Sequence, residues 1–384
     1  MELRIDDPTC PAPAPVARRF LHDARDVPFV RLYAVLLATV VPTGILLFVR
    51  FSWWLAALHL ALVLYFMGPY LLMHHNTAHR RLFKAPFTFL NTLGPWVVGP
   101  FFGESPETYF AHHVGMHHPE NNLEGDVSST LGYRRDSVTD FARYLLRFLL
   151  LGLPDMTSYF ARKKRRSLML RCALGELSLY AAVAALWLVD WRAALVVLVL
   201  PLLATRVGAM VANWAQHAFV DPAAPGNSYR STITCINTGY NRRCFNDGYH
   251  IGHHLEPTLH WSEMPVALRE DLATYEAEGA LVFEGLDYFQ IWACLMLRRY
   301  DWLERRVVRL GSDRRPPEEV RRLLQARATW TQTRARTLQE PGSRAHEALD
   351  RARGDAGAIL VDHRVADARG ATPQALRRDD LSNA

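Results

Sequence analysis

Four long apolar stretches limit what this chain can fold into more than any other feature. They cover residues 32–49, 51–73, 172–189 and 193–213, and the only strong charges within them are Glu176 and Arg206. A helix needs about 20 apolar residues to cross the hydrocarbon core of a bilayer. The sequence therefore predicts four transmembrane helices.

Very short connections join these stretches in pairs. Arg50 alone separates the first two stretches, and residues 190–192 separate the last two. Connections this short force neighbouring helices to run antiparallel, so each pair is predicted to be a helical hairpin. If nothing else spans the membrane, all segments outside the hairpins lie on one side of it.

The distribution of basic residues indicates which side that is. The hairpin tips hold only Arg50 and Arg192, whereas the segments outside the hairpins hold many more basic residues, including the run RKKRR at 162–166. The preference of Lys and Arg for the cytoplasm predicts that these segments and both termini are cytoplasmic, at the cell inner membrane if the chain is bacterial. The basic run either binds anionic lipid headgroups or an acidic protein, or is a solvated face that only sets the topology.

These observations predict an all-α integral membrane protein, in which two transmembrane helical hairpins (four spanning helices) carry a cytoplasmic helical cap. We expect a cytoplasmic N-terminal segment at 1–30, a membrane domain at 31–300 and a polar tail at 301–384. Within the tail, residues 317–340 are predicted to form one helix, and the remainder to be disordered because it contains Gly and Asp and has no aromatic pattern.

Three further segments are apolar but are not predicted to span. Residues 85–103 contain Gly-Pro twice, which argues against a straight helix, so this segment is predicted to be re-entrant or interfacial. Residues 141–154 carry two arginines and are predicted to form an interfacial amphipathic helix that is too short to span. The same prediction is made for residues 280–299.

Histidines are unevenly distributed along the chain. Of 16 histidines, 12 lie in five short clusters. Scattered histidines would indicate surface or core positions, whereas clustered ones indicate metal ligands. The clusters are His74, His75 and His79; His112, His113, His117 and His118; His217; His250, His253 and His254; and His260.

Helical spacing selects ligand candidates at the ends of two apolar stretches. His75 and His79 are four residues apart and share a helix face. His74 could replace His75, and the sequence leaves that choice open. Asn213 and His217 have the same spacing.

The remaining two clusters allow the same reasoning. On an α-helix, His113 and His117 share a face, His118 lies about 100° round from His117, and His112 points elsewhere. The last cluster has i, i+3, i+4 spacing. It consists of His250, His253 and His254.

The selected side chains supply nine imidazoles and one amide oxygen. One metal ion takes four to six ligands, so the set suits two ions. Imidazole ligands alone leave iron, zinc and copper open. The candidate ligands are His75, His79, His113, His117, His118, Asn213, His217, His250, His253 and His254.

The histidine motifs resemble those of the membrane-bound fatty acid desaturase and hydroxylase superfamily. HNTAH at 75–79, HVGMHH at 113–118 and HIGHH at 250–254 resemble its three histidine boxes, in the family order. NWAQH at 213–217 resembles the Asn-x-x-x-His element of members similar to stearoyl-CoA desaturase. The resemblance covers roughly residues 30–300, including both hairpins.

Three details qualify this resemblance. The second box has three residues between its first histidine and its histidine pair, where many members have two. The third box begins with His, unlike the Gln of front-end desaturases. The chain has no His-Pro-Gly-Gly motif, so a fused cytochrome b5 domain is not expected.

The resemblance implies a non-haem di-iron centre, held by the ten candidate ligands, that uses O2 as co-substrate. It further implies an oxidoreductase that introduces a double bond into a lipid-linked or CoA-linked acyl chain. A hydroxylase or ketolase acting on a lipid or hydrocarbon is the alternative, because both reactions begin by removing hydrogen from an unactivated methylene group. Electrons would come from a separate donor of ferredoxin or cytochrome b5 type with its reductase, and no nucleic acid partner is expected.

A zinc protein is the alternative from another class. A membrane hydrolase or receptor with a histidine-bound zinc ion would need three or four ligands, fewer than this chain offers. The five cysteines are scattered and include no Cys-x-x-Cys pair, so a disulfide framework or a cysteine-bound zinc site is not predicted.

Carboxylates close to the boxes are candidates for orienting the imidazoles. They are Asp126, Asp221, Asp247 and Glu263, each of which is also plausible as a helix cap or a turn residue. Two histidines outside the ligand set are predicted to be structural: His260, and His59 within the second apolar stretch.

The two charges inside the second hairpin are predicted to pair. Glu176 and Arg206 are each 15 residues from Trp191 at the tip, which puts both about 22 Å from it in antiparallel helices. Charges inside a membrane usually pair and face the bundle interior. The pair would brace the helix that carries Asn213 and His217; the alternative is that each side chain extends separately to the headgroups.

Overall fold

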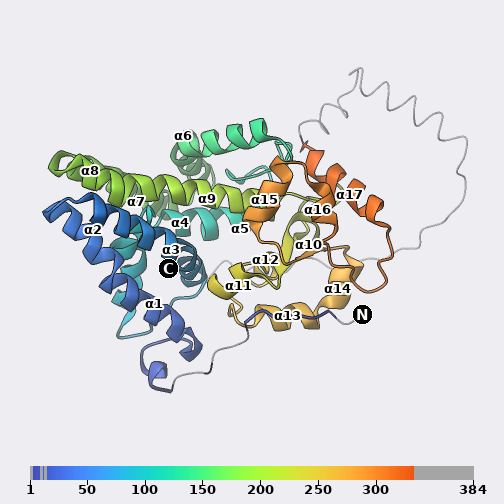
Figure 1. The fold of residues 1–384 in the computed structure, drawn as a ribbon, viewed down its shortest axis with the longest axis horizontal. Coiled ribbons are helices and arrows are strands. Elements are labelled where there is room, and N and C mark those ends of the chain that lie inside the picture. The colour runs from blue at the N-terminus through green and yellow to red at the C-terminus, as the bar shows by residue number, and fades with distance from the viewer. Residues whose placement is uncertain (1–2, 9–11, 13–14, 333–384) are drawn as a thin grey trace, which may run out of the picture. The chain divides into compact units, whose positions relative to one another are not determined.

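Four helices that are long and apolar enough to cross a membrane dominate the structure, a computed structural model that describes residues 3–8, 12 and 15–332 (Figure 1). They are Ala24–Val49, Trp53–His79, Arg166–Val189 and Trp191–Gln216. The prediction of four helices with the length and hydropathy of membrane spans is therefore confirmed.

These spans form the two predicted hairpins. The first hairpin consists of α1 (Val27–Ala38), α2 (Val40–Val49) and α3 (Trp53–His79). The second consists of α7 (Arg166–Val189), α8 (Trp191–Ala194), a π-helical turn (Leu195–Val199) and α9 (Leu200–Gln216). Helix α2 packs against α3, and α7 packs against α8 and the π-helical turn.

Polar side chains begin the returning helix at both hairpin tips. Ser52 accepts a hydrogen bond from the backbone N–H of Leu55 at 3.5 Å. Asp190 accepts one from the backbone N–H of Arg192 at 2.9 Å. Such caps satisfy amide groups that the first turn of a helix leaves without partners, so the chain can reverse within a few residues.

The ion pair predicted inside the second hairpin is present. Nη2 of Arg206 on α9 lies 2.5 Å from Oε2 of Glu176 on α7. The prediction of equal depth in two antiparallel helices is therefore confirmed. Its proposed bracing role stays a prediction.

Further helices and turns surround the ends of α3 and α9 (Figure 1). Before the second hairpin they are α4 (Thr108–His112), a π-helical turn (His113–His117), α5 (His118–Glu120) and α6 (Val138–Arg162). After it they are α10 (Ser228–Ser231), α11 (Gly239–Arg243), α12 (His250–Leu255), α13 (Met264–Glu270), α14 (Leu272–Ala277), α15 (Tyr288–Met296), α16 (Tyr300–Glu304) and α17 (Pro317–Thr329).

A small sheet lies among these elements, and the sequence analysis did not predict it. Strand β1 (Ile233–Ile236) pairs in parallel with β2 (Leu281–Glu284), with Ile233 opposite Leu281. The prediction that 280–299 forms one interfacial helix is wrong. This segment forms β2 and α15, and its apolar side chains, such as Phe283 and Ile291, are buried in a core shared with α9 and α17.

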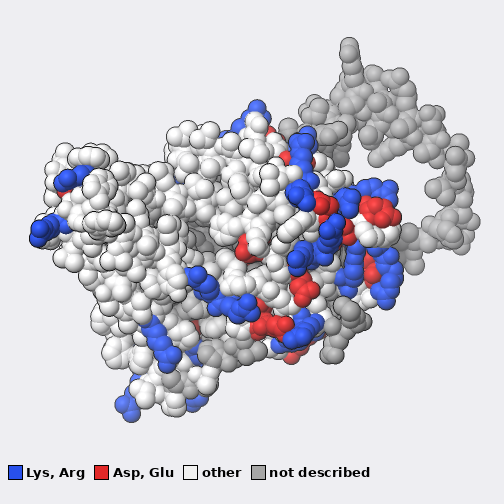
Figure 2. All heavy atoms as spheres, viewed as in Figure 1, with Lys and Arg blue, Asp and Glu red and all other residues white. Residues whose placement is uncertain are grey.

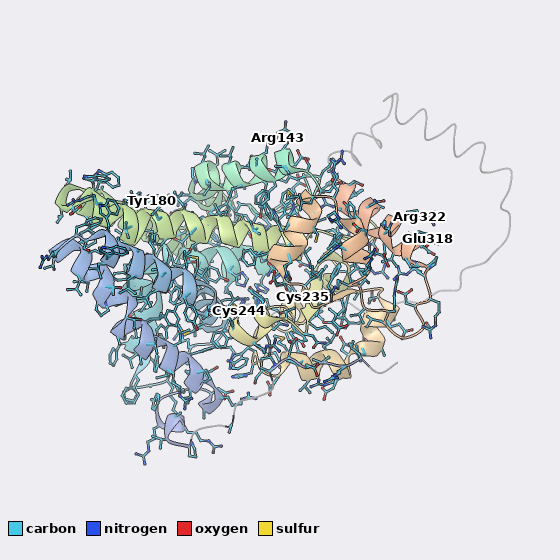
Figure 3. The ribbon with its side chains drawn as sticks, viewed as in Figure 1. Arg143, Tyr180, Cys235, Cys244, Glu318 and Arg322 are labelled. Carbon is cyan, nitrogen blue, oxygen red and sulfur yellow. The ribbon has the colours of Figure 1, made fainter. Side chains whose placement is uncertain are left out.

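The structure also describes the two other apolar segments. Residues 85–103 form short turns, Thr88–Thr92, Leu93–Val98 and Gly99–Phe102, so the prediction that they form no straight helix is confirmed. Residues 141–154 belong to the longer helix α6, which continues through Pro154 to Arg162. Arg143 on α6 is exposed and points away from the neighbouring helices (Figure 3).

The described residues beyond 300 belong to the same compact unit as the hairpins. Val320 and Leu324 on α17 are fully buried, while Glu318 and Arg322 on its other side face solvent (Figure 3). Helix α17 ends at Thr329, so the prediction of one helix to residue 340 is wrong at its end. The rest of the predicted tail lies outside the described residues.

Charged side chains are unevenly distributed over the surface (Figure 2). In that view they gather over the elements from α11 to α17, whereas the surface over the hairpins is almost free of charge except near its ends. An uncharged surface over four apolar helices fits a protein that is embedded in a membrane.

Candidate metal centre

Nine histidines from four segments of the chain lie together in two adjacent groups. The first group is His75, His79, His113, His118 and His253, and the second is His117, His217, His250 and His254. Within each group, one ring nitrogen from every residue lies within 4.8 Å of the others. These are the nine histidines that the sequence analysis selected.

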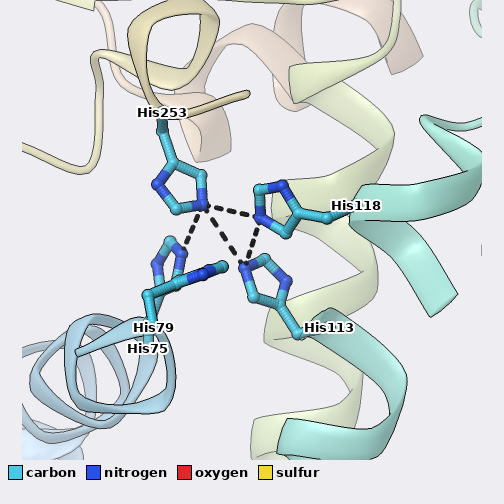
Figure 4. Close-up of side chains that lie close together, drawn as sticks. All are labelled: His75, His79, His113, His118 and His253. Carbon is cyan, nitrogen blue, oxygen red and sulfur yellow. Dashed lines mark hydrogen bonds between the residues drawn. The ribbon is translucent and has the colours of Figure 1, made fainter. Parts of the chain in front are cut away.

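The first group converges on the Nε2 atom of His253 (Figure 4). This atom lies 2.8 Å from Nε2 of His75, 2.9 Å from Nε2 of His118 and 3.4 Å from Nε2 of His113. The Nε2 atoms of His113 and His118 are 3.1 Å apart. The rings thus point their Nε2 atoms at one small volume.

The second group lies beside the first. Nε2 of His254 is 3.0 Å from Nε2 of His250. The ring of His117 lies 5.2 Å from the rings of both His217 and His254, measured between centroids. Because His117 and His118 are adjacent in sequence, the second box contributes to both groups.

Three acceptors fix how these rings are turned. Asp126 accepts a 2.6 Å hydrogen bond from Nδ1 of His117, and the backbone carbonyl of Ser231 accepts one from Nδ1 of His217 at 3.1 Å. Nδ1 of His75 lies 3.2 Å from a carboxylate oxygen of Asp247. Holding the proton on Nδ1 leaves the lone pair of Nε2 free toward the centre of each group.

Two of the four predicted orienting carboxylates therefore contact histidines, and two do not. Asp221 bonds Arg327 at 2.8 Å, and Glu263 bonds Arg25 at 2.7 Å. A carboxylate that is close to a histidine box in sequence therefore need not contact an imidazole, because Asp221 and Glu263 face other elements.

Burial favours the neutral form of several of these imidazoles. It lowers the pKa of His217 to about 3, with a smaller contribution from the neighbouring His117. Burial, with help from the surrounding imidazoles, also lowers the pKa of His113, His118 and His253 well below the usual value. Neutral imidazole is the form that binds a metal ion.

Hydrogen bonds between the rings cannot provide a partner for every imidazole nitrogen in such a cluster. A neutral imidazole has one N–H and one lone pair, yet His113, His118 and His253 point Nε2 atoms at one another. Nε2 of His79 and Nε2 of His217, one from each group, are buried without a hydrogen-bond partner in the described part of the chain. A metal ion in each group would accept all of these lone pairs, so the residues fit two ions of a metal that prefers nitrogen ligands.

A π-helical turn sets the register of the second box. His113–His117 form this turn, and the N–H of His118 bonds the carbonyl of His113 five residues earlier. The α-helical register predicted that His113 and His117 share a face, but the structure places them in different groups. In a π-helix, residues five apart lie one turn above each other, so His113 and His118 join the first group. The turn thereby accommodates the additional residue in this box.

The structure also separates the ligand candidates from neighbouring histidines. His75 lies in the first group, while His74 and His112 lie in neither. His74 stacks on Tyr70 in nearly parallel planes, with centroids 6.0 Å apart. His112 lies edge-on to Phe148.

Asn213 lies one helical turn before His217, at the end of α9. Its Nδ2 atom donates hydrogen bonds to the carbonyl of Ser128 at 2.9 Å and to Oη of Tyr144 at 2.7 Å. No hydrogen bond to its Oδ1 atom occurs among the described residues. The amide is therefore held by its nitrogen, and its oxygen remains open for a ligand.

The two histidines predicted to be structural have protein partners. Nε2 of His260 lies 3.0 Å from Asp26, which also bonds Arg80 at the end of α3. This network joins the N-terminal segment, the first box and the segment that follows the third box. Nδ1 of His59 lies 2.9 Å from the hydroxyl of Thr43.

A cavity of about 650 Å³ reaches the histidines. Its walls include His75, His113 and His250, which belong to the two histidine groups. It extends from them along the apolar residues of α3 and α9. A volume of this size is typical of sites for small molecules. Its mostly apolar walls suit a hydrocarbon chain.

Two contributors to the site were missed from the sequence. The ring of Tyr109 stacks on the ring of His113, with centroids 5.2 Å apart. Its position four residues before His113 on a helical segment could have signalled this contact. The contact of His217 with the backbone carbonyl of Ser231 could not have been predicted from the sequence, because every residue has a backbone carbonyl.

A family model described as fatty acid desaturase matches residues 16–286 of the chain. This range includes all nine histidines, Asn213 and both hairpins. Among curated proteins, none matches the chain significantly.

Proposed function

Because the chain belongs to the fatty acid desaturase family, we propose that it is an integral membrane enzyme that introduces a double bond into a lipid-linked or CoA-linked acyl chain. It would use O2 and two iron ions. The observation that carries this proposal is the convergence of nine imidazoles, in two groups, on one mostly apolar cavity.

The two groups divide the proposed ligands between two ions. The first group would hold one ion through five imidazoles, and the second would hold the other through four imidazoles, with the oxygen of Asn213 as a further ligand. When bound, the iron pair supplies the activation of O2 that removal of hydrogen from an unactivated methylene group requires.

The chain's own residues perform the positioning. Asp126 and Asp247 keep the protons of His117 and His75 on the nitrogens that face away from the ions. The cavity walls hold the acyl chain beside His113, where its ring is fixed by Tyr109. Apolar walls exclude bulk water, so the reacting methylene group meets the ions in a dry site.

The topology and the electron donor complete the proposal. We place the histidine groups and both termini on the cytoplasmic side, at the inner membrane if the cell is bacterial, because basic residues concentrate outside the hairpins. A separate carrier of ferredoxin or cytochrome b5 type would deliver electrons from that side. An acidic carrier would be attracted by the basic residues at 162–166.

Metal content and product chemistry test the proposal together. We expect about two iron ions per chain in the purified protein, whereas a single zinc ion would overturn the di-iron assignment. Expression in a host that lacks the activity, followed by lipid profiling, should yield a new unsaturated acyl species. A hydroxylated species would instead identify the hydroxylase alternative, and a His253→Ala variant provides the inactive control.

A further inference from the structure

Polar and charged residues, as well as apolar ones, line the cavity. It extends from the histidines along α9 to Arg206, which also lines it. Arg206 precedes Asn213 by seven residues on the same helix, so it lies about 10 Å from Asn213 along the helix axis. At this level Glu104, Ser105 and Glu176 also line the cavity. A plain hydrocarbon chain offers none of these groups a partner.

Most of this polar cluster is already satisfied by the protein itself. Glu176 accepts hydrogen bonds from Arg206 at 2.5 Å and from the hydroxyl of Ser105 at 2.6 Å. Arg206 also donates to Oη of Tyr180 at 3.1 Å. The charges of this pair therefore need no ligand.

Glu104 is the exception. It lines the cavity, and its carboxyl group has no hydrogen-bond or ion-pair partner within the described part of the chain. Burial raises the pKa of this carboxyl to about 7, with Arg206 opposing the shift. Near neutral pH it therefore exists in both forms and can either donate or accept a hydrogen bond. A polar group without a partner in such a place costs free energy.

The backbone holds Glu104 in this position. The preceding residue, Gly103, has a φ of 74°, and a Cβ atom there would lie 2.2 Å from the backbone of Leu202 on α9. Only glycine permits both this conformation and this close approach. The loop is thereby pressed against α9, which places Glu104 and Ser105 beside the cavity.

We propose that the substrate is a lipid whose chain carries a hydroxyl group, and that Glu104 binds this hydroxyl. This inference rests on the proposed function and specifies its substrate class. A hydroxyl both donates and accepts hydrogen bonds, so it satisfies Glu104 in either protonation state.

A binding measurement with a graded set of probes tests the inference. The probes are methyl octadecanoate and the methyl esters of hydroxyoctadecanoic acids that differ in the position of the hydroxyl. Each probe competes with a fluorescent fatty acid for the metal-loaded, full-length protein in lipid nanodiscs. We expect at least one hydroxylated isomer to bind about tenfold more tightly than methyl octadecanoate, the effect of one well-made buried hydrogen bond.

Variants of the cavity wall assign the preference to Glu104. Glu104→Leu should reduce the preference to less than about twofold, whereas Glu104→Gln, which keeps a hydrogen-bonding group, should retain part of it. Met67→Leu changes another cavity residue without removing a polar group and should keep the full preference. Equal binding of all probes to the unaltered protein overturns the inference, as does a preference that survives in Glu104→Leu.

Turnover of the same probes separates this inference from the proposed function. Oxidation of methyl octadecanoate, without any binding preference for a hydroxylated isomer, would support the enzyme activity and overturn the hydroxyl subsite. A preference that depends on Glu104, without oxidation of any lipid, would support the subsite and contradict the desaturase proposal.

Discussion

Asp126 and His117 form a buried hydrogen bond of 2.6 Å, in which Nδ1 of His117 faces the carboxylate. The other oxygen of Asp126 accepts hydrogen bonds from the backbone N–H and the hydroxyl of Ser128. The carboxylate is therefore fixed before any metal binds. It in turn fixes the tautomer and the orientation of a ring that belongs to the second histidine group.

Removal of this carboxylate should weaken metal binding without removing a ligand. We expect Asp126→Ala to lower iron affinity by about 10- to 100-fold, the usual effect of losing a partner that orients a metal-bound histidine. Titration of the metal-free protein with Fe(II) measures this. Asp221→Ala is the matched control, because Asp221 is also close to the boxes in sequence but bonds Arg327. Equal loss in both variants would show that the contact with His117 is not the cause.

Adjacent histidines in the second box should differ sharply in their effects. His113→Ala should abolish iron loading and activity, since His113 belongs to the first group. His112→Ala should retain much of both, because His112 belongs to neither group. Measurement of the iron content of the two purified variants tests this difference. Similar losses from both would mean that the arrangement of the rings differs in the metal-bound protein.

The ion pair between Glu176 and Arg206 should support the helix that carries Asn213. We expect Glu176→Gln and Arg206→Gln each to lower iron occupancy, because breaking a buried pair leaves one charge uncompensated, at about 3–5 kcal/mol. Exchanging the two charges should restore part of the occupancy. Normal iron loading in the single variants would contradict the bracing role.

A second ion pair offers a control for that experiment. Arg192 and Asp190 pair at the tip of the same hairpin, 2.9 Å apart, and 44% of the Arg192 side chain is exposed. An exposed pair contributes little, so Arg192→Gln should leave iron occupancy unchanged. A loss equal to that of Arg206→Gln would indicate a general effect of charge removal from this hairpin.

Acid should destabilise the metal-free protein. Burial holds the pKa of His217 at about 3, below its value near 6.5 in the unfolded chain. The unfolded state therefore binds more protons as pH falls below about 6.5, and stability falls by about 1.4 kcal/mol per pH unit for each histidine that stays neutral in the fold. Melting temperatures between pH 8 and pH 5 should decline, most steeply below pH 6.5. A flat profile would contradict the neutral, buried state of the cluster.

Hydropathy and the lengths of the connections predicted the long helices, because a helix depends mainly on residues that are close together in the sequence. Residues 32–49 and 172–189 are apolar over a length that only a spanning helix explains, and the short connections fixed their antiparallel pairing. Equal spacing from the tip was also enough to pair Glu176 with Arg206. Such relationships follow from the constant rise of a helix.

The predictions from the sequence that were wrong concern places where backbone hydrogen bonding departs from the regular pattern, or where segments distant in sequence meet. Nothing in residues 280–299 distinguished a strand from a helix, since the pairing partner of β2 lies almost fifty residues earlier. Asp221 and Glu263 resembled Asp126 and Asp247 in sequence, but only the fold determines which carboxylate faces a ring.

The sequence by itself determined that this chain has four membrane-length helices and nine histidines spaced as metal ligands. Only the tertiary structure decided how these histidines divide into two groups. A single π-helical turn brings the Nε2 atom of His118 next to that of His113, while His117 joins the second group. That turn reflects hydrogen bonds five residues apart, which side-chain periodicity does not reveal. The unpartnered carboxyl of Glu104 likewise became visible only once the loop was packed against α9.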